Sequence, residues 1–249
     1  RLINKSQKLN YNEYYLCDNK YFNLIDCPSN KVTINKMNFI SSYKTALILA
    51  PHTDDGELGC GGTIARLTDE GSDVYYAAFS TAAESVPKEF PSGILKEEVR
   101  NATLCLGIPS DNLFVYDYPV RKLNFSRQDI LEDLVQLRSR LSPDLVLMPS
   151  LNDFHQDHAT VAKEGLRAFK HVTILGYELP WNNLSINHQC FIKLQPSHME
   201  RKVAAVSEYR SQGRKSYVSE ESIFSLGRTR GVQIDTEFAE LFEVVRWIL

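Results

Sequence analysis

The sequence predicts an α/β fold in which a mainly parallel β-sheet is covered by helices on both faces. From Lys44 onward, short apolar runs of strand length alternate with amphipathic segments of helix length. Such alternation is typical of parallel sheets whose strands are connected by helices. The chain has 249 residues, of which 43% are hydrophobic. This is enough to fill the core of one such domain, and two small domains are not expected.

Five apolar runs have the character of buried strands, because each is short and is bounded by polar or turn-forming residues. In chain order they are Ala46–Ala50, Val74–Ser80, Asn112–Tyr116, Leu145–Pro149 and Val172–Tyr177. Five further segments carry their apolar residues at helical spacing. These predicted helices are Gly61–Glu70, Leu95–Leu106, Arg127–Leu141, Ala159–Phe169 and Ser197–Tyr209.

The first part of the chain differs in composition from the rest. It is polar and rich in Asn, Lys and Tyr, with short apolar patches at Tyr14–Leu16 and Tyr21–Ile25. We predict that residues 1–44 form an irregular or hairpin-like extension packed on the main domain. Residues 45–249 are then the main domain itself.

Charge and hydropathy exclude several classes of partner. The formal net charge is -3 and no long run of Lys or Arg occurs, so nucleic acid is not an expected partner. No apolar stretch approaches the ~18 residues that span a bilayer, and the segment after Arg1 lacks the apolar core of a secretory signal. We therefore expect a cytoplasmic protein without a transmembrane segment, and homo-oligomers are compatible with the sequence.

The cysteines do not form a recognisable framework. Five occur, at positions 17, 27, 60, 105 and 190, without Cys-x-x-Cys spacing. An odd and scattered set argues against structural disulfides and against a zinc site made of thiolates. Reduced thiols packed as small apolar side chains are expected instead.

Two polar clusters follow predicted strands. Residues 51–55 (PHTDD) come directly after the first strand, and residues 155–158 (HQDH) come after the fourth. Ligands of open α/β sheets bind outside the carboxyl ends of the strands, where the strand order reverses. We therefore expect the two clusters to face one crevice. Their His and Asp side chains are the types that hold a catalytic zinc ion through three protein ligands.

Spacing within each cluster favours a shared face. His52 and Asp55 are three residues apart, as are His155 and His158. Residues three apart in a helical turn lie on one side of it. If the second helix begins near Asp157, both of its imidazoles can face the crevice. More candidate ligands are present than three places require, so at least one polar group remains for proton transfer.

The same residues resemble a known family. Residues 49–55 (LAPHTDD) and 58–63 (LGCGGT) are similar to the first signature of the zinc-dependent N-acetylglucosaminyl deacetylases, the PIG-L or LmbE-like family. Residues 155–158 are similar to its second motif, and the likeness extends from about residue 44 to the end of the chain. The resemblance implies a Rossmann-like three-layer α/β/α sandwich that binds Zn²⁺.

The resemblance also implies a role for each motif residue. Asp54 would be the general base of the reaction. His155 would stabilise the oxyanion or protonate the leaving amine, and Asp157 would hold an imidazole in orientation. The zinc ligands would be His52, Asp55 and His158.

The chain departs from the family pattern at three positions. Thr53 and Gln156 stand where the family has Pro, and both are turn positions, so ligation should survive. Leu95 stands where many small-sugar members have an Arg that holds the substrate. Lys96 and Arg100 are the nearby cations, and we predict that they contact the substrate instead.

Two further arginines complete the predicted site. Arg228 and Arg230 would hold an anionic part of the substrate, such as a phosphate, with an exposed ion pair as the alternative. The predicted function is zinc-dependent removal of the acetyl group from an N-acetylated amino sugar, whether free, nucleotide-linked or in a glycoconjugate. The alternatives are an amidase for another amide such as a thiol-sugar conjugate, a metal-dependent phosphoesterase, and a non-catalytic zinc-binding protein.

Overall fold

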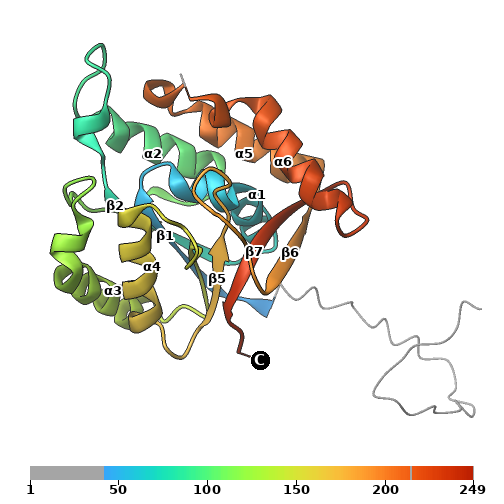
Figure 1. Cartoon of the computed structure of the whole chain (residues 1–249), viewed down its shortest axis with the longest axis horizontal. Helices are drawn as coiled ribbons and strands as arrows, with labels where there is room; N and C mark the ends of the chain where they lie inside the picture. The colour runs from blue at the N-terminus through green and yellow to red at the C-terminus, as the bar shows by residue number, and fades with distance from the viewer. Residues whose placement is uncertain (1–41, 214, 249) are drawn as a thin grey trace, which may run out of the picture. The chain divides into compact units, whose positions relative to one another are not determined.

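The predicted three-layer α/β/α sandwich is confirmed by a computed structural model that describes residues 42–213 and 215–248. Within these residues a seven-stranded sheet has the order β3-β2-β1-β4-β5-β7-β6, with helices on both of its faces (Figure 1). No helix in the described ranges combines the length and apolarity that crossing a membrane requires. The predicted extension 1–44 lies almost wholly outside the described residues and stays a prediction.

The five predicted strands form the parallel part of the sheet. In chain order they are β1 (Thr45–His52), β2 (Asp73–Ser80), β3 (Leu113–Val115), β4 (Leu145–Pro149) and β5 (Thr173–Tyr177). β1 is central and pairs in parallel with β2 on one side and β4 on the other. The chain leaves β1 toward β2 and later returns to β4, so the strand order reverses between β1 and β4.

The other edge of the sheet is antiparallel and was not predicted. β6 (Gln189–Leu194) and β7 (Phe238–Arg246) pair with each other in this way, and β7 also pairs antiparallel with β5. The helix before β7, α6 (Glu220–Val232), was missed as well. In β7 the buried Glu240 and Glu243 interrupt the apolar run, so the strand lacks the usual pattern of a covered strand.

The helices divide between two cores. One face of the sheet packs against α6 and three other helices, which are α1 (Asp55–Asp69), α2 (Ile94–Cys105) and α5 (Pro196–Ser207). The opposite face packs against α3 (Arg127–Leu141) and α4 (Gln156–Ala168). Side chains of β1 alternate between these cores, with Ile48 in the first and Leu47 and Leu49 in the second. This alternation is expected for a strand covered on both faces.

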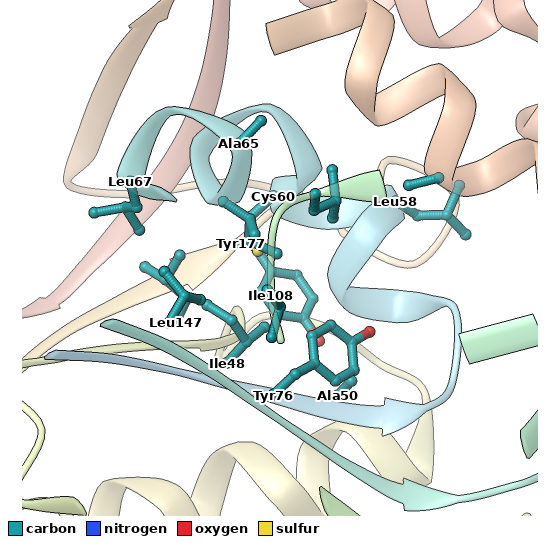
Figure 2. Close-up of a cluster of buried hydrophobic side chains, with 14 of the residues drawn as sticks. Ile48, Ala50, Leu58, Cys60, Ala65, Leu67, Tyr76, Ile108, Leu147 and Tyr177 are labelled. Atoms are coloured by element: carbon teal, nitrogen blue, oxygen red, sulfur yellow. The ribbon is translucent and has the colours of Figure 1, made fainter. Parts of the chain in front are cut away.

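Helix α1 begins at Asp55, six residues earlier than predicted. Its first turns contain glycines, which have low helix propensity and therefore concealed the start of the helix. A Cβ atom on Gly59 would lie 2.3 Å from Cδ2 of Tyr177, and one on Gly56 would lie 2.6 Å from the hydroxyl of Tyr76. Figure 2 shows both rings between α1 and the sheet. The glycines thus let the start of α1 lie directly on the carboxyl ends of the strands.

A buried ion pair holds the second half of α1. The helix is bent at Cys60, whose backbone angles are φ -146° and ψ 24°. The backbone N–H groups of Gly62 and Thr63 donate to the Glu240 carboxylate of β7 at 3.0 and 2.8 Å. The ammonium of Lys202 in α5 lies 2.6 Å from the same carboxylate. Since Glu240 accepts hydrogen bonds at the bend, it caps the second half of the helix.

Candidate metal centre

Both polar clusters lie at the carboxyl edge of the sheet, at the switch point between β1 and β4. His52 is the last residue of β1, and Asp55 is the first residue of α1. The second cluster spans the loop after β4 and the first turn of α4, with His155 at the N-cap position of that helix. The crevice expected from the sequence is therefore formed by two strand ends and the starts of two helices.

Three donor atoms of these clusters form a compact triangle. Oδ2 of Asp55 lies 3.1 Å from Nδ1 of His52 and 3.3 Å from Nε2 of His158. The two imidazole nitrogens are 3.3 Å apart. Ligand atoms about 2.0–2.1 Å from a tetrahedral zinc ion are themselves about 3.3 Å apart. The donor types and their spacing therefore fit a zinc ion held by His52, Asp55 and His158.

Carboxylates orient both imidazoles of the triangle. The Nε2 atom of His52 lies 3.0 Å from Oδ2 of Asp157, and Nδ1 of His158 lies 2.7 Å from Oδ2 of Asp153. Each ring thus turns its other nitrogen toward the triangle, an arrangement common among metal-binding histidines. Asp153 was missed by the sequence analysis, although a carboxylate five residues before His158 was the available signal.

Asp157 also fixes the segment that closes one side of the site. Its Oδ2 accepts the backbone N–H of Arg121 at 2.6 Å, and its Oδ1 accepts that of Leu123 at 3.2 Å. Arg121 has a φ of 64°, in the left-handed region that is unfavourable for a residue with a Cβ atom. The hydrogen bonds to Asp157 hold it there, which places the side chains of Val120 and Arg121 on the wall of the site.

Two buried tyrosines form hydrogen bonds with the backbone of Thr53, the residue before Asp54. The hydroxyl groups of Tyr76 and Tyr209 lie 2.9 and 2.6 Å from the carbonyl oxygen of Thr53. Both hydroxyls also contact the carboxyl group of Glu57, at 2.5 and 3.0 Å. Burial raises the pKa of Glu57 to about 8. Two phenols and a carboxyl group thus fix the turn that carries Asp54.

Asp54 and His155 lie beside the triangle. Burial and the charge of Asp55 raise the pKa of Asp54, whose carboxylate is 3.8 Å from the ammonium of Lys215. The ring of His155 is centred 4.4 Å from that of His158. Burial and the neighbouring imidazoles lower the pKa of His155. A raised pKa makes the carboxylate of Asp54 a better proton acceptor, and a lowered pKa makes a protonated His155 a better proton donor.

The two imidazoles of the triangle bind protons strongly when no metal is present. Burial lowers the pKa of His52, but the carboxylates of Asp55 and Asp157 outweigh it and raise that pKa to about 9. Burial likewise opposes charge on His158, yet Asp55 and Asp153 raise its pKa to about 10. At neutral pH a metal ion must therefore displace protons from the two imidazoles.

A cavity of about 290 Å³ opens above the triangle. Among its lining residues, the cations are Arg121 and Lys215. Lys96 and Arg100, which were predicted to contact the substrate, do not line it: both are exposed on α2, and the Lys96 ammonium lies 3.6 Å from a carboxylate oxygen of Asp117. The cations near the candidate active site therefore come from other segments than those the sequence suggested.

The two arginines of α6 are also absent from this cavity. Arg230 donates two hydrogen bonds to the carboxylate of Glu178, one of them at 2.9 Å from Nε. Arg228 lies on the surface, 3.6 Å from the carboxylate of Glu237. Both guanidinium groups thus pair with carboxylates of the protein. The exposed ion pair named as the alternative describes Arg228, whereas the pair of Arg230 with Glu178 is largely buried.

Comparison with known proteins identifies the family. Residues 47–169 match the model of the GlcNAc-PI de-N-acetylase (PIG-L) family. The chain thus contains a domain of the PIG-L, or LmbE-like, family, and the resemblance stated from the two motifs is confirmed. The matched range includes both clusters and ends at Phe169, so it covers most of β1 and the whole of β2, β3 and β4.

Three similar proteins illustrate the relationship. An uncharacterized deacetylase of Escherichia coli K12, YaiS, is 29% identical over 176 residues, which cover 68% of this chain and 91% of YaiS. A diacetylchitobiose deacetylase of Thermococcus kodakarensis is 30% identical over 149 residues, 54% of either chain. The solved structure of N,N'-diacetylchitobiose deacetylase from Pyrococcus horikoshii superposes with a TM-score of 0.69 at 21% identity, and the match covers 84% of this chain and 86% of that one. At that identity the structural likeness shows the fold alone.

Proposed function

We propose that this chain is a metal-dependent amide hydrolase that removes the acetyl group from an N-acetylated amino sugar, with Zn²⁺ as its ion. The observation that carries the proposal is the triangle of His52, Asp55 and His158, whose spacing suits one tetrahedral ion. Membership in the PIG-L family supports it, as do the two relatives that are named deacetylases. When bound, a zinc ion supplies a Lewis acid for the amide carbonyl and lowers the pKa of water.

The remaining residues of the site move protons and stabilise charge. Asp54 is outside the triangle and has a raised pKa, so it is suited to accept a proton from water and to return it. His155 lines the same cavity, where its imidazole would donate to the developing oxyanion or to the leaving amine. Asp153 and Asp157 keep the two ligand imidazoles oriented, and Asp157 also holds the backbone of Arg121 and Leu123.

An amino sugar suits the cavity above the triangle. Sugar hydroxyls need several hydrogen-bonding groups around a small polar pocket. Arg121, Asn182, Gln212 and Lys215 line this cavity and offer such groups. The Thermococcus kodakarensis relative is named for a diacetylated amino sugar, which supports the same substrate class. Cytoplasmic location and homo-oligomer formation stay predictions.

The proposal is tested by measuring acetate release together with metal content. Purified protein is analysed for divalent metals, stripped with a chelator, and assayed on N-acetyl sugars with and without added zinc. We expect about one zinc ion per chain and acetate release that zinc restores. Thiol-sugar conjugates and phosphate esters are assayed in parallel. Release of phosphate, or a protein that neither binds a divalent ion nor gains activity from one, would contradict the proposal.

A further inference from the structure

A second cavity, which the proposed chemistry does not use, lies beside the metal cavity. Its volume is about 430 Å³, and its walls come from α1, α5, α6, β7 and the segment after β5. We call it the apolar cavity because large apolar side chains make up much of its lining. They are Leu58, Met199, Ile223, Leu226 and Leu241.

The apolar cavity and the metal cavity share a wall. Leu58, Trp181 and Tyr217 line both of them. The rings of Trp181 and Tyr217 are stacked, with centroids 3.9 Å apart and planes inclined by 15°. The two cavities are therefore adjacent, and this shared wall is where one ligand would reach from the metal cavity into the apolar cavity.

The charged groups around the apolar cavity are already paired. Four charged residues line it. The ammonium of Lys202 lies 2.6 Å from the carboxylate of Glu240, and the guanidinium of Arg230 is hydrogen-bonded to Glu178. Each positive charge is thus neutralised by a neighbouring carboxylate of the same wall. Because little charge is left for a ligand, the lining favours an uncharged apolar group.

We propose that the apolar cavity binds an alkyl or aryl aglycone attached to the amino sugar, so that the substrate is an apolar N-acetylglycoside. The identity of the sugar part rests on the function proposed above. The apolar lining, the paired charges and the wall shared with the metal cavity all support this assignment. Transfer of an alkyl chain from water into such a cavity lowers the free energy in proportion to the apolar area that is buried.

Binding is tested without catalysis, by the fluorescence of Trp181. The chain has two tryptophans, so a Trp247→Phe background isolates Trp181. This protein is titrated with n-hexyl glucoside and with methyl glucoside, neither of which carries an acetyl group. We expect saturable quenching by the hexyl compound at a concentration at least about tenfold lower than by the methyl compound. Equal responses to the two compounds would overturn the proposal.

Variants locate the binding on the apolar cavity. Leu226→Lys places a charge in its wall, and Ser225→Phe, at an exposed position of the same helix, fills its edge. Val232→Lys is the matched control, because this side chain on α6 is 74% exposed and outside the cavity. We expect the preference for the hexyl compound to disappear in the first two variants and to persist in the control. A preference that survives both cavity variants in folded protein would overturn the proposal.

Kinetics then connect the cavity to the reaction. Acetate release is compared for the hexyl and methyl glycosides of N-acetylglucosamine. We expect kcat/KM to be at least about tenfold higher for the hexyl glycoside, and Leu226→Lys to remove this difference. Equal values for the two glycosides would contradict the assignment. If neither glycoside releases acetate while Trp181 still distinguishes hexyl from methyl glucoside, the proposed function is wrong and the apolar ligand of the cavity is supported.

Discussion

The metal cavity and the apolar cavity share a wall but arrange their charges in opposite ways. In the metal cavity, donor atoms of His52, Asp55 and His158 converge within 3.3 Å of one another. In the apolar cavity, the Lys202 ammonium is matched by the Glu240 carboxylate. Converging donors are suited to bind an ion, whereas matched charges hold elements of the fold together. Burial of a charge alone therefore does not mark a functional residue in this protein.

The two cavities also come from different halves of the sheet. The metal cavity lies where the parallel strands β1 and β4 diverge, and parallel α/β sheets bind ligands at that position. The apolar cavity depends on α6 and β7, which belong to the antiparallel edge. The proposals made above assign the chemistry to the parallel half and the apolar part of the substrate to a cavity that depends on the antiparallel half. Three changes test this separation.

The largest effect is expected from Asp54→Asn in the metal cavity. Loss of a general base lowers kcat by about 10²–10⁴-fold. Asp54 is outside the ligand triangle, so zinc content should stay at the wild-type value, and so should quenching of Trp181 by hexyl glucoside. The measurements are single-substrate kinetics and metal analysis. Loss of the metal together with activity would refute the separate roles given to Asp54 and Asp55.

A change in the buried ion pair should affect stability and not the metal. Lys202→Met leaves the Glu240 carboxylate buried without a cation, which costs about 3–5 kcal/mol of the free energy of unfolding. Both side chains are almost fully buried, at 5% and 6% exposure. The double variant Lys202→Met, Glu240→Gln should recover part of the loss. Urea denaturation measures the stability, and metal analysis of the folded protein measures the zinc content. A Lys202→Met variant that keeps full stability but has lost its zinc would contradict the structural role given to this ion pair.

The smallest of the three effects is expected from Asp153→Asn. This change replaces the carboxylate that lies 2.7 Å from Nδ1 of His158 by a neutral amide. Substitution of such a partner weakens metal binding by about 10–100-fold, measured by competition with a chromogenic chelator. Asp111→Asn, at an exposed acid outside both cavities, should leave zinc affinity unchanged. An affinity equal to that of the control would show that Asp153 does not orient the ligand.

The local sequence pattern was sufficient to predict the parallel half of the sheet. The strands β1 to β5 are continuous apolar runs, and such runs are recognisable because strands covered on both faces carry few polar residues. The two polar clusters were found because one stands directly after the first of these runs and the other a few residues after the fourth. Their meeting at one point followed from the general behaviour of parallel sheets. Asp153 was overlooked although it stands only two residues before the second cluster.

The local sequence pattern was not sufficient to predict the antiparallel half of the sheet or the residues on the substrate side of the site. β7 contains buried carboxylates whose partners are remote: Glu240 is bonded to Thr63, 177 residues away. Such a strand does not look apolar in sequence. Arg230 was predicted to bind an anion because its partner Glu178 is 52 residues away, so the sequence did not reveal their ion pair. Arg121 and Lys215 were not considered, since nothing near them in sequence indicates that they face the metal cavity.

The fold class, the family and the residues proposed to hold and use a metal ion followed from the sequence, because they depend on residue types at short spacing next to apolar runs. The tertiary structure alone decided how the imidazoles are oriented, which cations line the metal cavity, and that an apolar cavity lies beside it. The physical reason is that these features depend on contacts between distant segments, such as the stacking of Trp181 on Tyr217. Only the packing of helices on the sheet brings such segments together.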